Sequence, residues 1–254
     1  MKEKAGDGRI EADAFEKAWL FFESVKKALK TKNRFSNDDL DRLVSRIVNV
    51  KAFCYTIPAG SVLYRSRMYS RKDASYRHRS LGEEEAFKGY DSKGSYVNPV
   101  SDLVAEGRCN PEYISYLYTS QSVECCIHEM RPNMYSYVSV ADIKVKEKLN
   151  MLGLDKDEPV RDANEYIVKG VPDSFLMQYL NLAFSSPYEG YGDYLLSQYI
   201  SEKIKNHGFD GLSFRSAVYD EVGKNTNYVI FNYSKCEAVS SKLYQVKNIR
   251  ISYD

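Results

Sequence analysis

Apolar side chains recur with a helical period through the first fifty residues of the chain. From Asp13 to Leu29 the large hydrophobic residues stand three or four positions apart, which predicts an amphipathic helix. A second run with the same period follows the tetrapeptide Ser36-Asn37-Asp38-Asp39, an acidic variant of the capping box with Ser36 at the cap position. We therefore assign residues 1–51 to a helical N-terminal extension.

From residue 52 the pattern changes to short runs of aromatic and branched residues, which are typical of strands. Helical periods return later, and one of them ends before Gly208, a residue type that marks helix ends. Strands and helices alternate irregularly, which favours an α+β fold over a doubly wound sheet. The predicted strands are Phe53–Ile57, Ser61–Met68, Tyr116–Thr119, Tyr135–Val145, Gly211–Phe214, Tyr228–Tyr233 and Leu243–Ile251, and the predicted helices are Asp173–Phe184 and Asp193–Asn206.

Two stretches lack such periods. The segment from Tyr69 to Asn110 is rich in glycine, serine and charged residues, and its length is typical of a mobile, ligand-shaping region. The turn Tyr188-Glu189-Gly190-Tyr191-Gly192 lacks the glycine spacing and the preceding strand of a dinucleotide-binding fold, and no phosphate-loop Gly-Lys-Ser or Gly-Lys-Thr occurs. A nucleotide ligand would therefore bind without a Rossmann motif.

Charge and composition argue against several functional classes. Lysine and arginine number 36 against 35 acidic residues, so the net charge does not steer the protein toward nucleic acid or an anionic membrane. No stretch approaches the roughly 20 apolar residues that a membrane-spanning helix needs. An odd number of cysteines, 5, argues against a disulfide-stapled secreted domain. We expect a soluble, cytoplasmic protein that binds neither membrane nor nucleic acid.

Metal and nucleophile sites have weak support in the sequence. Cys125 and His128 stand three residues apart beside Glu129, but no cysteine pair has zinc-finger spacing, and buried cysteines are common on apolar helix faces. Neighbours on one helix rarely supply a thiol, an imidazole and a third orienting group. Ser216 lies outside a Gly-x-Ser-x-Gly elbow, which argues against a hydrolase triad. We expect no bound metal and no resident cofactor.

The sequence also predicts a short helix around Glu129. Ser122 can cap this helix, and Pro132 ends it.

Five short motifs occur in order along the chain. The motifs are Leu63-Tyr64-Arg65, Gly107-Arg108-Cys109-Asn110-Pro111, Tyr116-Leu117-Tyr118, Glu129-Met130-Arg131-Pro132, and Phe209-Asp210-Gly211 followed by Ser216 and Tyr228-Val229-Ile230-Phe231. This ordered set, over roughly residues 52–240, resembles the RES domain family, which is named for its arginine, glutamate and serine.

The resemblance implies a fold similar to ADP-ribosyltransferases, with a mixed β core and surrounding helices, and we assign residues 52–254 to a RES-like catalytic domain. It also implies that NAD is a substrate whose nicotinamide–ribose bond is cleaved, by hydrolysis or by phosphorolysis. Many members are toxins held by an antitoxin, which implies a toxin or defence effector with a protein neutraliser or regulator. The helical extension could bind such a partner, act as a sensor, or mediate self-association into a homo-oligomer.

Carried onto this sequence, the resemblance implies catalytic roles for Arg65, Glu129 and Ser216. Arg65 would hold the diphosphate through its planar fork. Glu129 would stabilise the positive charge that develops on the ribose, and Ser216 would fix the ribose or the amide. Tyr118 would stack on the nicotinamide ring. The implied substrate-binding residues are Tyr64, Arg108, Asn110 and Tyr118.

Each assignment has a structural alternative. Arg65 could pair with a surface acid, and Tyr118 could belong to the core. Glu129 could bond nearby backbone, and Ser216 could cap a turn. Arg108 could be a solvated loop residue. Two other functions also stay open at this point: transfer of ADP-ribose to a protein or nucleic acid, and a noncatalytic NAD-binding or interaction module.

Overall fold

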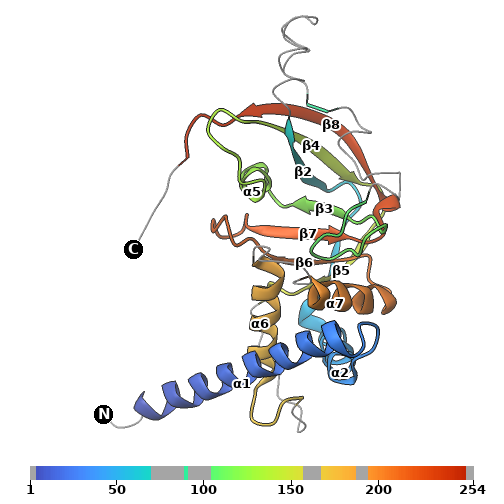
Figure 1. Cartoon of the computed structure of the whole chain (residues 1–254). Helices are drawn as coiled ribbons and strands as arrows, with labels where there is room; N and C mark the ends of the chain where they lie inside the picture. The colour runs from blue at the N-terminus through green and yellow to red at the C-terminus, as the bar shows by residue number, and fades with distance from the viewer. Residues whose placement is uncertain (1–3, 70–88, 91–103, 157–166, 187–193, 250–254) are drawn as a thin grey trace, which may run out of the picture.

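The computed structural model describes residues 4–69, 89–90, 104–156, 167–186 and 194–249, with side chains from residue 13 onward (Figure 1). The segment between Tyr69 and Asn110, expected to shape a ligand site, lies largely outside these ranges. The glycine turn at residues 188–192 lies entirely outside them. The fold is therefore given by the elements on either side of these segments.

A single eight-stranded sheet forms the centre of the described structure, with the strand order β1-β5-β6-β7-β3-β2-β4-β8. Only β5 and β6 pair in parallel, and every other neighbouring pair in this sheet is antiparallel. This mixed topology confirms the predicted α+β class. The strands are β1 Cys54–Ile57, β2 Val62–Tyr69, β3 Leu117–Ser120, β4 Tyr137–Val145, β5 Leu149–Gly153, β6 Gly211–Arg215, β7 Thr226–Ile230 and β8 Cys236–Gln245.

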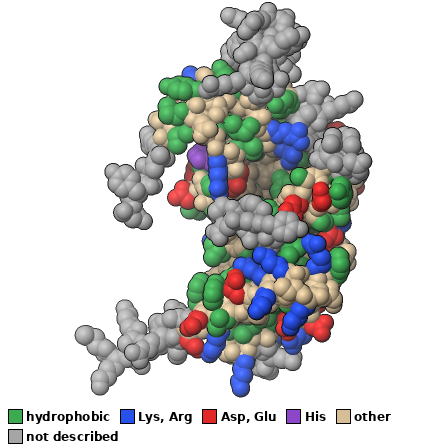
Figure 2. All heavy atoms as spheres, in the orientation of Figure 1, with side chains coloured by type: hydrophobic (Ala, Val, Ile, Leu, Met, Phe, Trp, Pro, Cys, Tyr) green, Lys and Arg blue, Asp and Glu red, His purple; other side chains and the backbone are tan. Residues whose placement is uncertain are grey.

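Helices cover one end of the sheet in two layers. Figure 1 shows α6 and α7 against the β6 end, α1 and α2 outside them, and the short α5 beside β3. On the face drawn in Figure 2, lysine, arginine and acidic side chains are interspersed over this helical part. The α-helices are α1 Lys4–Thr31, α2 Asp38–Ile47, α5 Val123–Glu129, α6 Asp173–Ser185 and α7 Leu195–Asn206, and two single turns lie at Lys51–Phe53 and Tyr233–Lys235.

The two N-terminal helices share their core with the sheet domain. Phe22 of α1 is fully buried and stacks on Tyr179 of α6 with ring centroids 4.2 Å apart. Leu40 of α2 is also fully buried, in one hydrophobic cluster that continues through Phe184 of α6 to Phe214 of β6. Residues 13–47 therefore complete the core over α6 and α7 and are packed as an integral layer.

Several element boundaries differ from those expected. The cap of α2 is Asn37, whose side chain accepts from the Leu40 backbone N–H at 3.0 Å, so the capping-box assignment to Ser36 is wrong by one residue. Strand β5 was not predicted, because its five residues lie in a short run without flanking turn signals. Strand β8 begins at Cys236, earlier than the predicted Leu243, because its largely exposed side chains carry little hydrophobic signal.

Side-chain alternation divides the sheet into two faces. Tyr118 and Ser120 of β3 pair in register with Val229 and Asn227 of β7, so these four residues share one face. Leu117 and its partner on β7 point to the other face, where they join a second hydrophobic cluster. The polar pair Ser120 and Asn227 therefore lies on the face that α5 covers.

Within the described residues, no helix is both long and apolar enough to cross a bilayer. All five cysteines are free thiols, and four of them are buried.

Candidate active site

The short helix α5 places Glu129 at its carboxyl-terminal end. Its N-cap, Ser122, accepts a hydrogen bond from the Cys125 backbone N–H at 3.1 Å, as the sequence predicted. The same hydroxyl donates to the Lys224 carbonyl at 3.0 Å, which fastens the start of α5 to the segment before β7. The chain leaves the helix through Arg131, whose φ of 45° is left-handed. The position of Glu129 is thus set by contacts at both ends of a helix of about two turns.

The Glu129 carboxylate is held by two donors from distant parts of the chain. The Ser216 hydroxyl, just beyond β6, donates to Oε1 at 2.6 Å. The side-chain amide of Asn227 donates to the same oxygen at 2.6 Å. The second carboxylate oxygen, Oε2, accepts no hydrogen bond from the described residues. The structure therefore joins two of the three predicted catalytic residues directly and leaves one carboxylate oxygen unbonded.

The hydroxyl of Ser216 has its hydrogen-bonding capacity filled. It donates to Glu129, and it accepts from the backbone N–H groups of Val218 at 3.2 Å and Tyr219 at 3.1 Å. A hydroxyl has one donor and two acceptor positions. Ser216 therefore both closes a turn, as one alternative reading proposed, and anchors Glu129.

Asn227 belongs to this cluster and was missed by the sequence analysis. It is buried on β7, and its Oδ1 accepts from the Ser120 hydroxyl at 2.7 Å. The signal available was an asparagine beside the apolar run of Tyr228–Phe231, a position at which a buried polar group needs partners. Those partners lie on β3 and α5, more than ninety residues away in the chain, and a single sequence does not reveal them.

Arg65 lies where β2 and β3 separate. These strands meet at the registered pair of Tyr64 and Ser120, and one residue further Arg65 donates from Nη1 to the Tyr118 carbonyl at 3.0 Å. Its Nε is buried without a hydrogen-bond partner in the described part of the chain. Burial, and next the charge of Arg67, lower the pKa of Arg65 to about 10, so the guanidinium stays charged at neutral pH. A surface ion pair, one of the alternatives considered, is absent for this residue among the described side chains.

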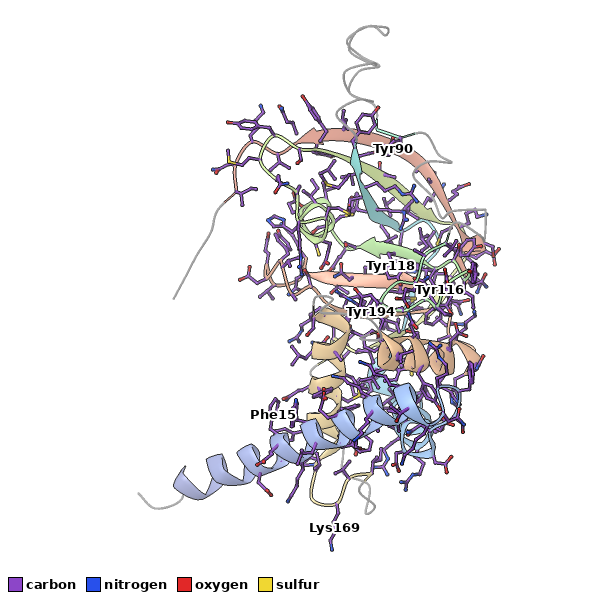
Figure 3. All side chains as sticks on the ribbon, in the orientation of Figure 1. Phe15, Tyr90, Tyr116, Tyr118, Lys169 and Tyr194 are labelled. Atoms are coloured by element: carbon purple, nitrogen blue, oxygen red, sulfur yellow. The ribbon has the colours of Figure 1, made fainter. Side chains whose placement is uncertain are left out.

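Tyr118 and Asn110 are joined to each other. The Tyr118 hydroxyl donates to Asn110 Oδ1 at 2.7 Å and accepts from the Cys109 backbone N–H at 2.9 Å. The half-buried Tyr118 ring packs against the large core cluster, and Figure 3 places it with Tyr116 between the strands and α7. The Asn110 amide nitrogen donates to the carbonyls of Ala105 and Pro111. The Asn110 side chain thus stabilises the conformation of its own loop, and the Tyr118 hydroxyl links that loop to β3.

Arg108 has a different setting from the substrate-binding or solvated loop position considered above. Its two terminal nitrogens donate to the carbonyls of Phe184 and Ser186, at 2.5 and 2.9 Å. Its guanidinium also lies over the Phe214 ring, 5.5 Å from the centroid. These carbonyls are at the end of α6, where helices leave acceptors unsatisfied. In the structure Arg108 therefore caps α6 and does not reach the Glu129 cluster through any of these contacts.

Tyr64 is half-buried on the same sheet face as Ser120, its partner in register. Ser66, two residues along β2, shares this face and donates to the Cys126 carbonyl of α5 at 2.6 Å. A cavity of about 450 Å³ lies beside this helix, lined by His128, Arg131 and Val218 together with Val246, Asn248 and Ile249 after β8. None of Glu129, Ser216 and Asn227 lines this cavity, which is bounded by His128, the residue before Glu129, and by Val218, two residues after Ser216.

The two thiols and the imidazole of α5 lie in different environments. Cys125 is buried against Asn227, whereas His128 is exposed, bonded through Nδ1 to the Glu124 carbonyl and packed on the Tyr219 ring. Burial raises the pKa of Cys125 to about 11 and that of Cys126 to about 12, so both stay protonated at neutral pH. Among the described side chains, no group of three or more His, Cys, Asp or Glu is placed to hold a metal.

Comparison with known proteins identifies relatives. The family model described as "RES domain" matches residues 77–254. Glu129, Ser216 and Asn227 lie inside this range, whereas Arg65 precedes it although β2 belongs to the same sheet.

Among solved structures, the chain is similar to one in the crystal structure of the M. tuberculosis MbcT–MbcA toxin–antitoxin complex. The TM-score is 0.40 at 14% identity, over 81% of this chain and 92% of that one. The search of curated proteins gave no match. Because the family model covers well over half of the sequence, the chain belongs to the RES domain family.

Proposed function

We propose that this protein cleaves the nicotinamide–ribose bond of NAD, by hydrolysis or by phosphorolysis, and thereby acts as a toxin or defence effector. The observation that carries the proposal is the Glu129 carboxylate, held at 2.6 Å by both Ser216 and Asn227, with Oε2 accepting no hydrogen bond from the part of the chain that the structure describes. Membership of the RES family, whose members break down NAD, supports the same reading.

The chemistry of the reaction accounts for a preorganised carboxylate. When the bond from the pyridinium nitrogen to the ribose carbon breaks, its electron pair stays on nitrogen and nicotinamide leaves as a neutral molecule. Positive charge then develops on the ribose carbon, and a fixed carboxylate stabilises that charge. Water or phosphate adds to this carbon and loses a proton. No general acid is needed for the leaving group, so a single well-placed carboxylate suffices.

Arg65 is the proposed diphosphate ligand. Its guanidinium is charged at neutral pH and lacks an acidic partner among the described residues. Its buried Nε also donates to no acceptor among them. A diphosphate supplies charge and paired oxygens for such a fork. Tyr118, whose backbone carbonyl accepts a hydrogen bond from Arg65, would stack its ring on the nicotinamide.

The wider features implied by the family complete the proposal. The mixed sheet with flanking helices is proposed to be an ADP-ribosyltransferase-like fold. A protein antitoxin is the proposed neutralising partner, and the proposed setting is the cytoplasm. NAD is the substrate, and no resident cofactor is needed.

The test is nicotinamide release from NAD by the purified protein, with and without inorganic phosphate. We expect wild-type activity, and a loss on the order of a hundredfold or more in Glu129→Gln, which keeps the shape of the side chain but removes its charge. Glu124→Gln makes the same change on the exposed side of α5 and should retain activity. Arg65→Ala should raise KM for NAD.

The products separate the alternative reactions. Free ADP-ribose indicates hydrolysis, ADP-ribose 1-phosphate indicates phosphorolysis, and label from adenine-labelled NAD retained on a macromolecule indicates ADP-ribosyl transfer. Binding of NAD without turnover would identify a noncatalytic module. If the wild-type protein is active and Glu129→Gln loses only about tenfold or less of the rate, Glu129 does not take part in the reaction. An uncharged carboxamide cannot replace a carboxylate that stabilises positive charge, so a larger loss is required.

A further inference from the structure

Asn227 is the least expected member of the Glu129 cluster. It is 6% exposed, lies on β7 opposite Ser120 of β3, and bonds to a carboxylate carried by α5. One side chain therefore links three elements at the point where the proposed chemistry takes place.

The orientation of the Asn227 amide follows from its neighbours. Oδ1 receives the Ser120 hydroxyl at 2.7 Å and lies 3.7 Å from the Cys125 sulfur, and Nδ2 faces Glu129. The opposite amide orientation would set a carbonyl oxygen against the Glu129 carboxylate, which repels it. Ser120 and Glu129 together therefore select one orientation, in which Asn227 can only donate to the carboxylate.

Two donors on one oxygen leave the other oxygen for the ligand. Ser216, from the turn after β6, and Asn227, from β7, both bond Oε1 of Glu129 at 2.6 Å. We propose that Asn227 is a positioning residue that acts with Ser216 to anchor Oε1 and so directs Oε2 toward the ribose, an assignment that rests on the proposed function.

The physical reason is the freedom of the glutamate side chain. Glu129 is the last residue of α5 and has three rotatable bonds, so a single hydrogen bond leaves the carboxylate able to pivot about it. Donors from two separate segments, the turn after β6 and strand β7, fix both its position and its direction. A misplacement of about 1 Å in such a group can cost on the order of a hundredfold in rate.

The test compares Asn227→Asp with wild type in the nicotinamide-release assay. The substitution keeps the acceptor for Ser120 but replaces the donor to Glu129 with a second carboxyl oxygen. We expect kcat to fall by about a hundredfold, with KM for NAD changed by less than about threefold, because Arg65 and not Asn227 contacts the diphosphate. Asn33→Asp, the same change at the exposed turn after α1, should leave both constants as in wild type.

A stability measurement keeps the test independent of folding. Asn227→Asp should lower Tm by about 4 °C, because two carboxylates then face each other. Adding Glu129→Gln to Asn227→Asp removes the repulsion between the two carboxylates, so the Tm should rise again while nicotinamide release stays absent. Circular dichroism at the assay temperature confirms that each variant is folded.

The outcomes separate this inference from the proposed function. Wild-type protein that releases no nicotinamide rejects the proposed function. Active wild-type protein with Asn227→Asp folded and within about threefold of its kcat rejects the role of Asn227 alone. A fall in kcat with a matching rise in KM also rejects it, because that pattern describes a residue that binds substrate. A large fall in kcat alone, with Tm restored in the double variant, supports it.

Discussion

At the scale of single residues, the candidate site depends on hydrogen bonds that are already made. The Ser216 hydroxyl donates its one proton to Glu129, and its two acceptor positions are occupied by backbone N–H groups. A hydroxyl in this state has no capacity left to bind ribose directly. Its proposed contribution to activity therefore passes through Glu129, in contrast with the substrate contact that the family resemblance implied.

This reading predicts the behaviour of Ser216 variants. Ser216→Ala removes one anchor of Glu129 and the link that closes the turn, so we expect a loss of roughly 1 kcal/mol in the free energy of unfolding. We expect kcat to fall by about tenfold or more. Ser216→Thr keeps the hydroxyl and should retain most of both quantities. Urea titration and nicotinamide release measure the two effects. A rise in KM with unchanged kcat in Ser216→Ala would instead indicate a direct substrate contact.

At the scale of elements, the loop Gly107–Pro111 connects three parts of the fold. Asn110 within it receives the Tyr118 hydroxyl, and Gln198 of α7 donates to the carbonyls of Gly107 and Asn110. Arg108 points the other way and caps the end of α6. The loop is thus a structural junction between β3, α6 and α7.

The junction predicts the effect of changing Arg108. Arg108→Met keeps the aliphatic length over Phe214 but leaves the α6 carbonyls without their donor, so we expect the free energy of unfolding to fall by about 1–3 kcal/mol. KM for NAD should stay near the wild-type value, because the guanidinium is directed at backbone. Chemical denaturation measures the free energy of unfolding, and the steady-state assay measures KM. A large rise in KM at unchanged stability would restore the substrate-binding role.

At the scale of the whole molecule, the N-terminal helices are part of the core. Phe22 stacks on Tyr179, and α2 is tied to α7 by Asp41, which accepts from both Tyr199 and Lys203. Arg46 of α2 forms an ion pair with the buried Asp173 at the start of α6. Removal of these helices would expose the apolar faces of α6 and α7 to water.

Two changes test this integration. Phe22→Ala should lower the free energy of unfolding by about 3–5 kcal/mol, as is usual for a fully buried phenylalanine. Phe15→Ala, on the exposed side of the same helix (Figure 3), should change it by no more than about 0.5 kcal/mol. A fragment of residues 52–254 should fail to fold cooperatively. A fragment with the wild-type Tm would show that residues 1–51 are a separable extension.

Local patterns were sufficient for much of the fold. The helical periods before Leu29 and before Gly208, the cap at Ser122, and the alternation in β4 depend on residues close together in the chain, and each of these features is present in the structure. Glu129 and Ser216 could be named because they belong to ordered family motifs. The cap of α2 was misplaced because Ser36 and Asn37 are adjacent residues that both favour caps.

By itself, the sequence determined most of the secondary structure, the α+β class and the family, because these depend on periodicity and on motifs read along the chain. Only the tertiary structure decided which side chains meet. Asn227 reaches Glu129 because β7 pairs with β3 beneath α5, and Arg108 turns to α6 because that helix ends beside its loop. Such contacts join residues about eighty to a hundred positions apart, and strand register and helix packing, rather than local preference, set their geometry.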